Sequence, residues 1–344
     1  MKKPVKNHGH SARAKLLAIA HEREIQLEYV LLRYAFERFL WRLGKSRHHD
    51  SLVLKGASAF AVWLGPFVRV TRDADMEAFG DATPERLVAA FREICAIPCP
   101  EDGVVFDDGS FVASAIRKQG GYPGIRISFR AEIGGAKLPM QIDIGFGDSI
   151  YPTAHDEDYP VLLGGEMPRI RIYPRYTIVA EKFQAMVSLD MANSRLKDFY
   201  DIWILSERFD FDGELLHTAI AKTFMRRRTS MPNMTPPALT SRFGENPAKM
   251  SQWTAFLKNA GLDDKDLPLT AVLGRIKMFL LPVVGSSEPN GMVWRAGQDW
   301  TRSYTPKSPF ASAGPGARPK CPRCGWEHDP GDTICKNPAC KTQF

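Results

Sequence analysis

The chain has 344 residues, of which 44% are hydrophobic and 25% are charged. These values are close to the averages for globular proteins and exclude a disordered body. The sequence contains no uncharged apolar run of about 18 residues and no apolar stretch of signal length at its N-terminus, which excludes a membrane-spanning helix and argues against export. We therefore expect a cytoplasmic protein with one large domain or two ordinary ones.

The net charge of +7 is concentrated at one end of the chain. Residues 1–50 hold eleven Lys and Arg against five Asp and Glu, a surplus of six that is nearly the whole excess. A basic end suits a polyanionic partner such as RNA. A solvated helix face and a loose terminus would account for the same charges.

The first half of the chain alternates helices and strands. In chain order, the patterns predict helices within 11–43, a buried strand at 51–54, a turn at 55–56, a helix at 57–64 and a strand from 68 that runs into 73–75. A helix at 84–96 and short strands at 104–106, 111–116, 125–129 and 140–146 follow, with glycine pairs at 120–121 and 134–135 as turns. This order predicts an α+β core.

The second half is helical from residue 177 onward and includes a predicted helix at 265–282. The stretch from 286 to 319 is rich in Ser, Gly and Pro, which predicts a linker. The predicted units are a basic helical segment (1–50), a mixed core (51–172), a helical lobe (173–285), the linker (286–319) and a cysteine-bearing end (320–344).

Three carboxylates in the core have the spacing of a metal site. Residues two apart in an extended segment point to the same side, so Asp73 and Asp75 aim at one place. The alternation of residues 141–146 puts Asp143 opposite its buried apolar neighbours. If the two strands pair, the three carboxylates converge and can hold two Mg²⁺ ions, one activating an attacking hydroxyl and one neutralising a departing pyrophosphate. A lone Asp-x-Asp is more often a solvated turn.

A turn with a hydroxyl, Gly56-Ala57-Ser58, lies between the first strand and the helix that follows it. Backbone N–H groups at the N-terminus of a helix are a site for phosphate oxygens. An ordinary connection between a strand and a helix would explain the same glycine.

Four blocks carry a more specific pattern. They are Leu54-Lys-Gly-Ala-Ser-Ala-Phe60, Arg69-Val-Thr-Arg-Asp-Ala-Asp75, Ala180-Glu-Lys-Phe-Gln-Ala-Met186 and Asn193-Ser-Arg-Leu-Lys-Asp-Phe-Tyr-Asp201. These blocks resemble, in order, those of the AbiEii nucleotidyltransferase toxins of bacterial toxin–antitoxin and abortive phage-infection systems. The resemblance runs from about residue 12 to residue 281. It implies a polymerase-beta-like nucleotidyltransferase core, a mixed sheet with flanking helices, and a helical C-terminal lobe.

The resemblance also implies roles for residues of the first two blocks. Gly56 and Ser58 would contact phosphate, and Asp73 and Asp75 would bind the metal. Thr71 matches a hydroxyl that some members carry just before that pair. Many members have a second glycine directly after Gly56, where this chain has alanine.

In the later blocks, Lys182 matches a lysine that binds the triphosphate. Lys197, Asp198 and Asp201 match the final motif, in which an Asp supports catalysis, and Asp198 is our choice for that role. A surface lysine with a buried stem would also explain Lys182. An ion pair one helical turn apart would also explain Lys197 and Asp201.

Four of the six cysteines lie in the last 24 residues: Cys321, Cys324, Cys335 and Cys340. Two pairs separated by ten residues predict a four-thiolate zinc ribbon, with His328 as a substitute ligand. Metal binding would supply the folding free energy of so small a unit. Reduced thiols in a disordered tail are the alternative. Cys95 and Cys99 are expected to be ordinary buried thiols.

The sequence therefore predicts a magnesium-dependent nucleotidyltransferase that uses a nucleoside triphosphate as substrate. The resemblance implies that its acceptor is RNA, with a tRNA 3′ end as the expected site, that translation is arrested, and that an antitoxin protein is the partner. Two alternatives stay open. One is a small-molecule, drug-modifying nucleotidyltransferase, and the other is a non-catalytic nucleic-acid-binding protein whose zinc ribbon is the working part.

Deleting residues 315–344 is expected to alter acceptor choice or stability more than the chemical step, because the predicted carboxylates lie elsewhere in the chain. Single-turnover rates and nucleic-acid binding of the full and shortened chains test this. A folded deletion variant with no single-turnover activity would contradict the expectation. Loss of binding on deletion, with no effect of Asp73→Ala, would favour the non-catalytic alternative.

Overall fold

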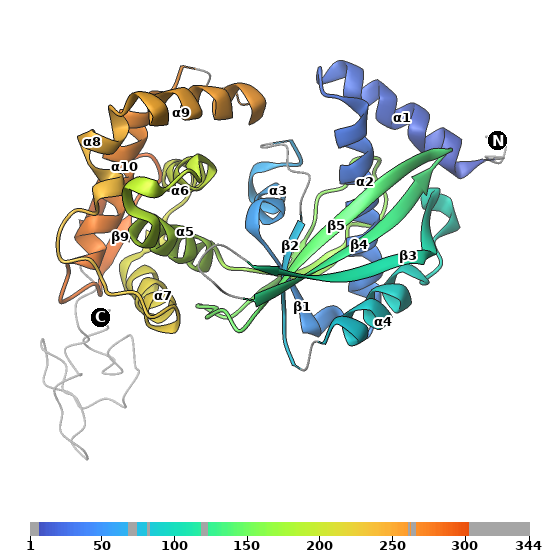
Figure 1. Cartoon of the computed structure of the whole chain (residues 1–344), viewed down its shortest axis with the longest axis horizontal. Coiled ribbons are helices and arrows are strands. Elements are labelled where there is room, and N and C mark those ends of the chain that lie inside the picture. Colours follow the sequence, from blue (N-terminus) through green and yellow to red (C-terminus); the bar gives the residue numbers. More distant parts are fainter. Residues whose placement is uncertain are drawn as a thin grey trace, which may run out of the picture.

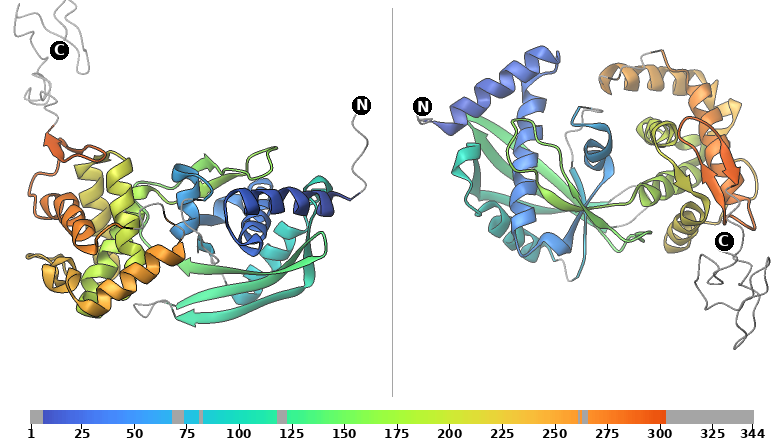
Figure 2. Two further views of the ribbon diagram at one scale, coloured as in Figure 1. Left: turned by 90° about the horizontal axis from the view of Figure 1, so that it is seen from above. Right: turned by 180° about the vertical axis from the view of Figure 1, so that it is seen from behind.

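The computed structural model describes residues 7–67, 74–80, 83–117, 123–260, 262 and 266–302. These residues form two lobes side by side, a sheet covered by helices and a mainly helical lobe (Figure 1). The views from above and from behind show the same division (Figure 2). Among the described helices, none is long and apolar enough to cross a membrane.

The first lobe is built on a mixed sheet. Within the described residues its strands are β1 (Leu52–Lys55), β2 (Ala74–Ala78), β3 (Val104–Arg117), β4 (Pro123–Ile133), β5 (Ala136–Phe146), β6 (His155–Asp158) and β7 (Arg169–Ile172), in the order β3-β4-β5-β2-β1-β7-β6. The pairs β2–β5 and β1–β7 are parallel and the other pairs are antiparallel. This is the α+β fold that the sequence predicted.

Helices α1 (His8–Glu22), α2 (Leu27–Lys45), α3 (Phe60–Leu64) and α4 (Pro84–Cys95) complete this lobe. From Ile125 to Ile133 strand β4 alternates, with Ile127, Phe129 and the other odd-numbered residues buried. Phe129 packs against Phe39 of α2 and Phe91 of α4, with ring centroids 5.9 and 6.1 Å away. The even-numbered residues of β4 therefore face away from these two helices.

Residues 104–106 and 111–116, predicted as separate strands, form the single strand β3. Its pairing with β4 is irregular between Asp107 and Val112. The Asp107 carboxylate accepts a hydrogen bond from the Gly109 N–H, and the Ser110 hydroxyl accepts one from the Arg130 N–H of β4. Side chains thus replace ladder bonds at a β-bulge, so the strand continues across it.

The second lobe contains α5 (Arg175–Leu189), α6 (Leu196–Arg208), α7 (Gly213–Arg226), α8 (Ser241–Gly244), α9 (Pro247–Ala260) and α10 (Leu269–Val284). Three short strands among the described residues, β8 (Phe211–Asp212), β9 (Met292–Trp294) and β10 (Trp300–Arg302), form a small sheet beside them. The predicted linker at 286–319 therefore begins with structured chain. Trp294 and Trp300 explain this, because they pack on Phe279 with centroids 4.9 and 6.0 Å away.

Four of the basic residues in 1–50 form ion pairs with carboxylates elsewhere in the chain, two of them in the interior and two at the surface. Arg38 and Arg42 are buried and pair with Asp102, at 3.0 and 2.7 Å. Farther along, Lys45 pairs with Glu166 and Arg47 with Glu93. These partners lie outside residues 1–50, so the N-terminal surplus does not by itself mark an RNA-binding surface.

Cys95 and Cys99 are free thiols; Cys99 is buried, as the sequence predicted, whereas Cys95 is only half-buried. The Arg38 guanidinium donates to the Cys99 sulfur at 3.4 Å. The predicted zinc ligands lie outside the described residues, so the zinc ribbon remains a prediction.

Asp102→Asn is expected to lower the free energy of unfolding by about 3–5 kcal/mol, because it removes the carboxylate that two buried guanidinium groups share. Urea denaturation measures this loss. Glu93→Gln, which breaks an exposed pair with Arg47, should leave the urea midpoint nearly unchanged. Equal effects of the two substitutions would contradict the prediction.

Candidate active site

A row of four charged residues crosses the middle of the sheet. Lys55 of β1 lies opposite Asp75 of β2, Asp75 lies opposite Asp143 of β5, and Asp143 lies opposite Arg126 of β4. Residues directly opposite one another on neighbouring strands point to the same face. The row therefore has two carboxylates at its centre and a cation at each end, on the face that α2 and α4 leave open.

The turn predicted to contact phosphate lies directly beside this row. Gly56 has a φ of +68°, a conformation that favours glycine. A Cβ atom at position 56 would lie 2.7 Å from Oδ2 of Asp75, so a side chain there would strain the backbone and collide with the carboxylate. Gly56 thus lets the turn and Asp75 approach closely. Ser58 follows in the same turn and is buried.

Asp143 is held by a bidentate ion pair. Nε of Arg126 donates to Oδ1 at 2.7 Å, and a terminal nitrogen donates to Oδ2 at 2.9 Å. The Asp143 side chain is 16% exposed and that of Arg126 is 34% exposed. Two parallel bonds of this kind fix the orientation of both groups.

The third predicted carboxylate, Asp73, and the neighbouring Thr71 lie outside the described residues. Within the described part of the chain, no group of three or more His, Cys, Asp or Glu side chains is placed to hold a metal ion. Of the three predicted metal-binding carboxylates, the structure describes two, Asp75 and Asp143, which lie opposite each other on neighbouring strands.

Lys182 of α5 lies in a second charged cluster. Its ammonium group is 2.7 Å from a carboxylate oxygen of Asp198 and 2.7 Å from one of Asp201, and Arg195 lies 2.8 Å from the other oxygen of Asp198. Burial alone would raise the pKa of Asp198, but Lys182 and Arg195 outweigh it and hold the pKa below its usual value. Lys182 is thus a largely buried, paired lysine and not a surface one.

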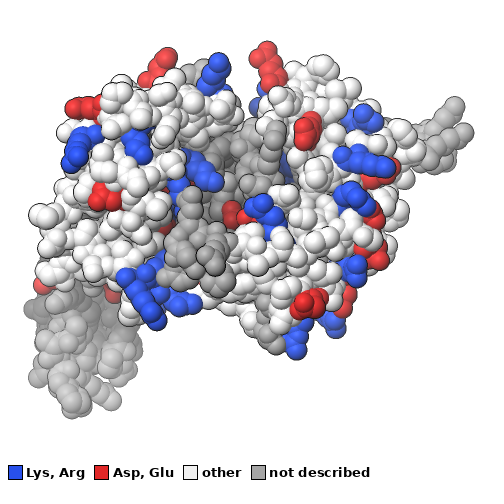
Figure 3. Space-filling model, in the orientation of Figure 1, with Lys and Arg blue, Asp and Glu red and all other residues white. Residues whose placement is uncertain are grey.

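Lys197 is exposed on α6, whereas Asp198 and Asp201 of the same motif are buried. Asp201 forms an ion pair with Lys182. The two later blocks of the sequence therefore lie on two helices, α5 and α6, whose charged side chains meet. Figure 3 shows Lys, Arg, Asp and Glu side chains of both lobes on the described surface near the boundary between them.

The model of one protein family, described as the nucleotidyl transferase AbiEii toxin of a type IV toxin–antitoxin system, matches residues 38–275. The match covers more than half of the chain and runs from α2 into α10. The chain belongs to the AbiEii nucleotidyltransferase toxin family.

Two solved structures are similar to this AbiEii-family chain. One is a candidate nucleotidyltransferase from H. pylori, with 14% identity and a TM-score of 0.45, and the match covers 76% of this chain and 96% of that one. The other is JHP933 from Helicobacter pylori, with 14% identity and a TM-score of 0.43, over 73% and 89% of the two chains. No curated protein matches the chain.

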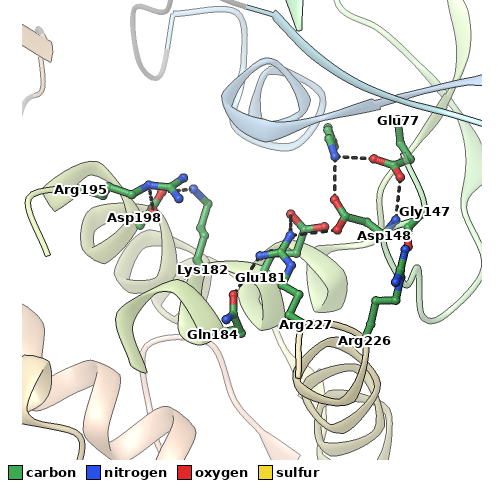
Figure 4. Close-up of polar contacts among 11 residues, drawn as sticks. Glu77, Gly147, Asp148, Glu181, Lys182, Gln184, Arg195, Asp198, Arg226 and Arg227 are labelled. Atoms are coloured by element: carbon green, nitrogen blue, oxygen red, sulfur yellow. Dashed lines mark hydrogen bonds and ion pairs between the residues drawn. The ribbon is translucent and has the colours of Figure 1, made fainter. Parts of the chain in front are cut away.

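This AbiEii-family chain has a further charged network that sequence reasoning missed (Figure 4). The Lys55 ammonium group contacts Glu77 at 2.5 Å and Asp148 at 2.9 Å. Arg227, just beyond α7, contacts the other oxygen of Asp148 at 3.1 Å and Glu181 of α5 at 3.2 Å. The network therefore joins the sheet to two helices of the second lobe.

Neighbouring residues of α5 thus serve different contacts. Glu181 faces the sheet through Arg227, while Lys182 faces α6 through Asp198 and Asp201. An unusual charge pair between apolar residues was visible in the sequence at 181–182. The sequence signal for Lys55 was weaker, because it consisted only of a charged residue at the end of a predicted buried strand. No local pattern identified Asp148 or Arg227.

Burial strongly affects the groups in this network. It raises the pKa of Glu181, although Lys55 and Arg227 oppose the effect. Burial also acts to raise the pKa of Asp148, but Lys55 and Arg227 outweigh it and lower the pKa to about 2. The ionised form of Asp148 is therefore bound tightly between two cations.

Asp148→Asn is expected to lower the free energy of unfolding by about 2 kcal/mol at pH 7, since a pKa depressed from 3.8 to about 2 stabilises the fold wherever Asp148 is ionised. That stability is present above pH 4 and is lost as the pH falls towards 2. Urea denaturation at several pH values measures the difference. Asp210→Asn at the surface should have a smaller effect, and a pH-independent loss for Asp148→Asn would contradict the assignment.

Proposed function

We propose that this chain is a magnesium-dependent toxin that transfers a nucleoside monophosphate from a nucleoside triphosphate to a hydroxyl of RNA, the 3′ end of tRNA. The observation that carries the proposal is the parallel register that sets Asp75 beside Asp143, next to the Gly56 turn. Membership of a family of nucleotidyltransferase toxins supports the class of reaction. A polymerase-beta-like core is part of the proposal, and the mixed sheet with its flanking helices supports it.

The donor set at the centre of the row fits Mg²⁺, which prefers carboxylate oxygens. Asp75 and Asp143 would hold the metal ions, with Asp73 as a third ligand on the residue-spacing argument. When bound, Mg²⁺ would activate the attacking hydroxyl and neutralise charge on the departing pyrophosphate.

The protein's own groups bind and orient the triphosphate. Backbone N–H groups of the turn at Gly56 and the Ser58 hydroxyl would contact phosphate oxygens. Lys182 would act as a point charge on the triphosphate, oriented by Asp198 and Asp201, which lie 2.7 Å from its ammonium group. Thr71 and Lys197 are further proposed nucleotide contacts.

In the proposed reaction the acceptor oxygen attacks the α-phosphorus in line. The new bond forms as the bond to the bridging oxygen of the β-phosphate breaks. The hydroxyl loses its proton to solvent and pyrophosphate leaves. Positioning by the turn and stabilisation of developing charge by Lys182 are the protein's main contributions. Modified tRNA would no longer support translation, and a cognate antitoxin protein would limit this activity.

A second candidate is a nucleotidyltransferase with a small-molecule acceptor. One observation favours it, since Arg38, Arg42, Lys45 and Arg47 are paired within the fold. The N-terminal charge then gives less support for an RNA acceptor than its sum suggested. The carboxylate row would serve both reactions equally.

Incubation of the protein with total tRNA, Mg²⁺ and each α-³²P-labelled nucleoside triphosphate in turn is expected to label the tRNA. Asp75→Ala should reduce labelling about 100-fold or more, because a metal ligand is lost, while the protein stays folded. Asp107→Ala, which removes an exposed carboxylate of β3 paired with Arg130, is the control and should label normally.

Label on small alcohols but not on tRNA would support the second candidate. Full activity of Asp75→Ala would show that the assigned mechanism is wrong. Asp73→Ala is expected to behave like Asp75→Ala, both in labelling and in loss of any toxicity to cells that express it.

A further inference from the structure

Adjacent carboxylates at the centre of the row create an electrostatic problem. Asp75 and Asp143 are direct partners on neighbouring parallel strands, and like charges in such positions repel. In the described structure the guanidinium of Arg126 holds both oxygens of Asp143, at 2.7 and 2.9 Å. A cation is therefore already bound to one of the two proposed metal ligands.

The two cations at the ends of the row differ in burial. The Lys55 side chain is 7% exposed and is held by Glu77 and Asp148. The Arg126 side chain is 34% exposed. A long side chain with that exposure can leave its partner without burying an unpaired charge, whereas Lys55 cannot.

Guanidinium and Mg²⁺ both carry positive charge and would repel each other if they shared Asp143. The planar fork of arginine fits phosphate as well as it fits carboxylate. A triphosphate that extends from the Gly56 turn across Asp75 and Asp143 would offer such an oxygen pair to Arg126 at the far end of the row. Arg126 therefore fits two anions, the Asp143 carboxylate before the substrate binds and a phosphate group of the triphosphate afterwards.

We propose that Arg126 exchanges partners during substrate binding. It neutralises Asp143 before metal binds, and it contacts the triphosphate once the metal takes that carboxylate. This inference rests on the proposed function, since it uses Asp143 as a metal ligand. It adds Arg126 as a substrate-contacting residue and makes metal and nucleotide binding interdependent.

The test measures binding directly. Mn²⁺ replaces Mg²⁺ as the probe, because carboxylate sites take both, and its affinity is followed by electron paramagnetic resonance of the free ion. Arg126→Gln is expected to bind Mn²⁺ roughly three- to tenfold more tightly, because no guanidinium competes for Asp143. At saturating Mn²⁺, the affinity of the Arg126→Gln variant for a non-hydrolysable ATP analogue should be roughly ten- to a hundredfold lower than that of the unchanged protein.

Arg130→Gln is the matched control, since Arg130 lies on the same face of β4 and pairs with Asp107 at 2.6 Å. It should change neither affinity. Arg126→Lys should keep part of the nucleotide affinity, because the charge remains without the fork. Thermal melting checks that each variant is folded.

Weaker Mn²⁺ binding by Arg126→Gln would show that Arg126 only supports Asp143, and the inference would fail. Unchanged nucleotide affinity would overturn it as well. Mn²⁺ binding that survives Asp75→Asn has a different meaning, because it would overturn the metal assignment of the proposed function and this inference with it.

Discussion

The parallel pairing of β2 with β5 is the constraint on which the rest of the site depends. It fixes Asp75 next to Asp143 although the two residues lie far apart in the chain. Neighbouring carboxylates are unfavourable unless cations compensate them. The compensation comes from Arg126 at one end of the row, while the close approach of the turn to Asp75 requires glycine at position 56. The proposed binding of a metal-bound polyphosphate rests on this anionic pair and on the turn that lies beside it.

The two lobes are joined through charge as well as through packing. Lys55, Asp148, Arg227 and Glu181 link the strands of the carboxylate row to α5. The next residue of α5, Lys182, carries the charge proposed to act on the triphosphate. Any movement of α5 would therefore change the separation between Lys182 and the carboxylates. The contacts that hold α5 must therefore place Lys182 precisely, because a misplaced charge contributes little to transition-state stabilisation.

Charge counting along the chain proved a poor guide to surface chemistry. The N-terminal surplus suggested a surface for a polyanion, yet Arg38 and Arg42 are buried against Asp102. Composition gives the charge of a side chain but not the residue with which that side chain pairs. The family match, the register of the sheet and the contacts of Lys182 now support a nucleotidyltransferase more strongly than net charge does.

The sequence by itself determined the α+β class, the order of the main elements and the family, because hydrophobic periodicity and short motifs are local properties of the chain. It also indicated that Asp75 and Asp143 would converge if their two strands paired, and the structure pairs β2 with β5. The tertiary structure decided what no local pattern contains. It paired Arg126 with Asp143, joined Lys55 and Arg227 through Asp148, and folded residues 292–302 onto Phe279. Each of these contacts joins residues far apart in the chain, so only sheet register and lobe packing bring them together.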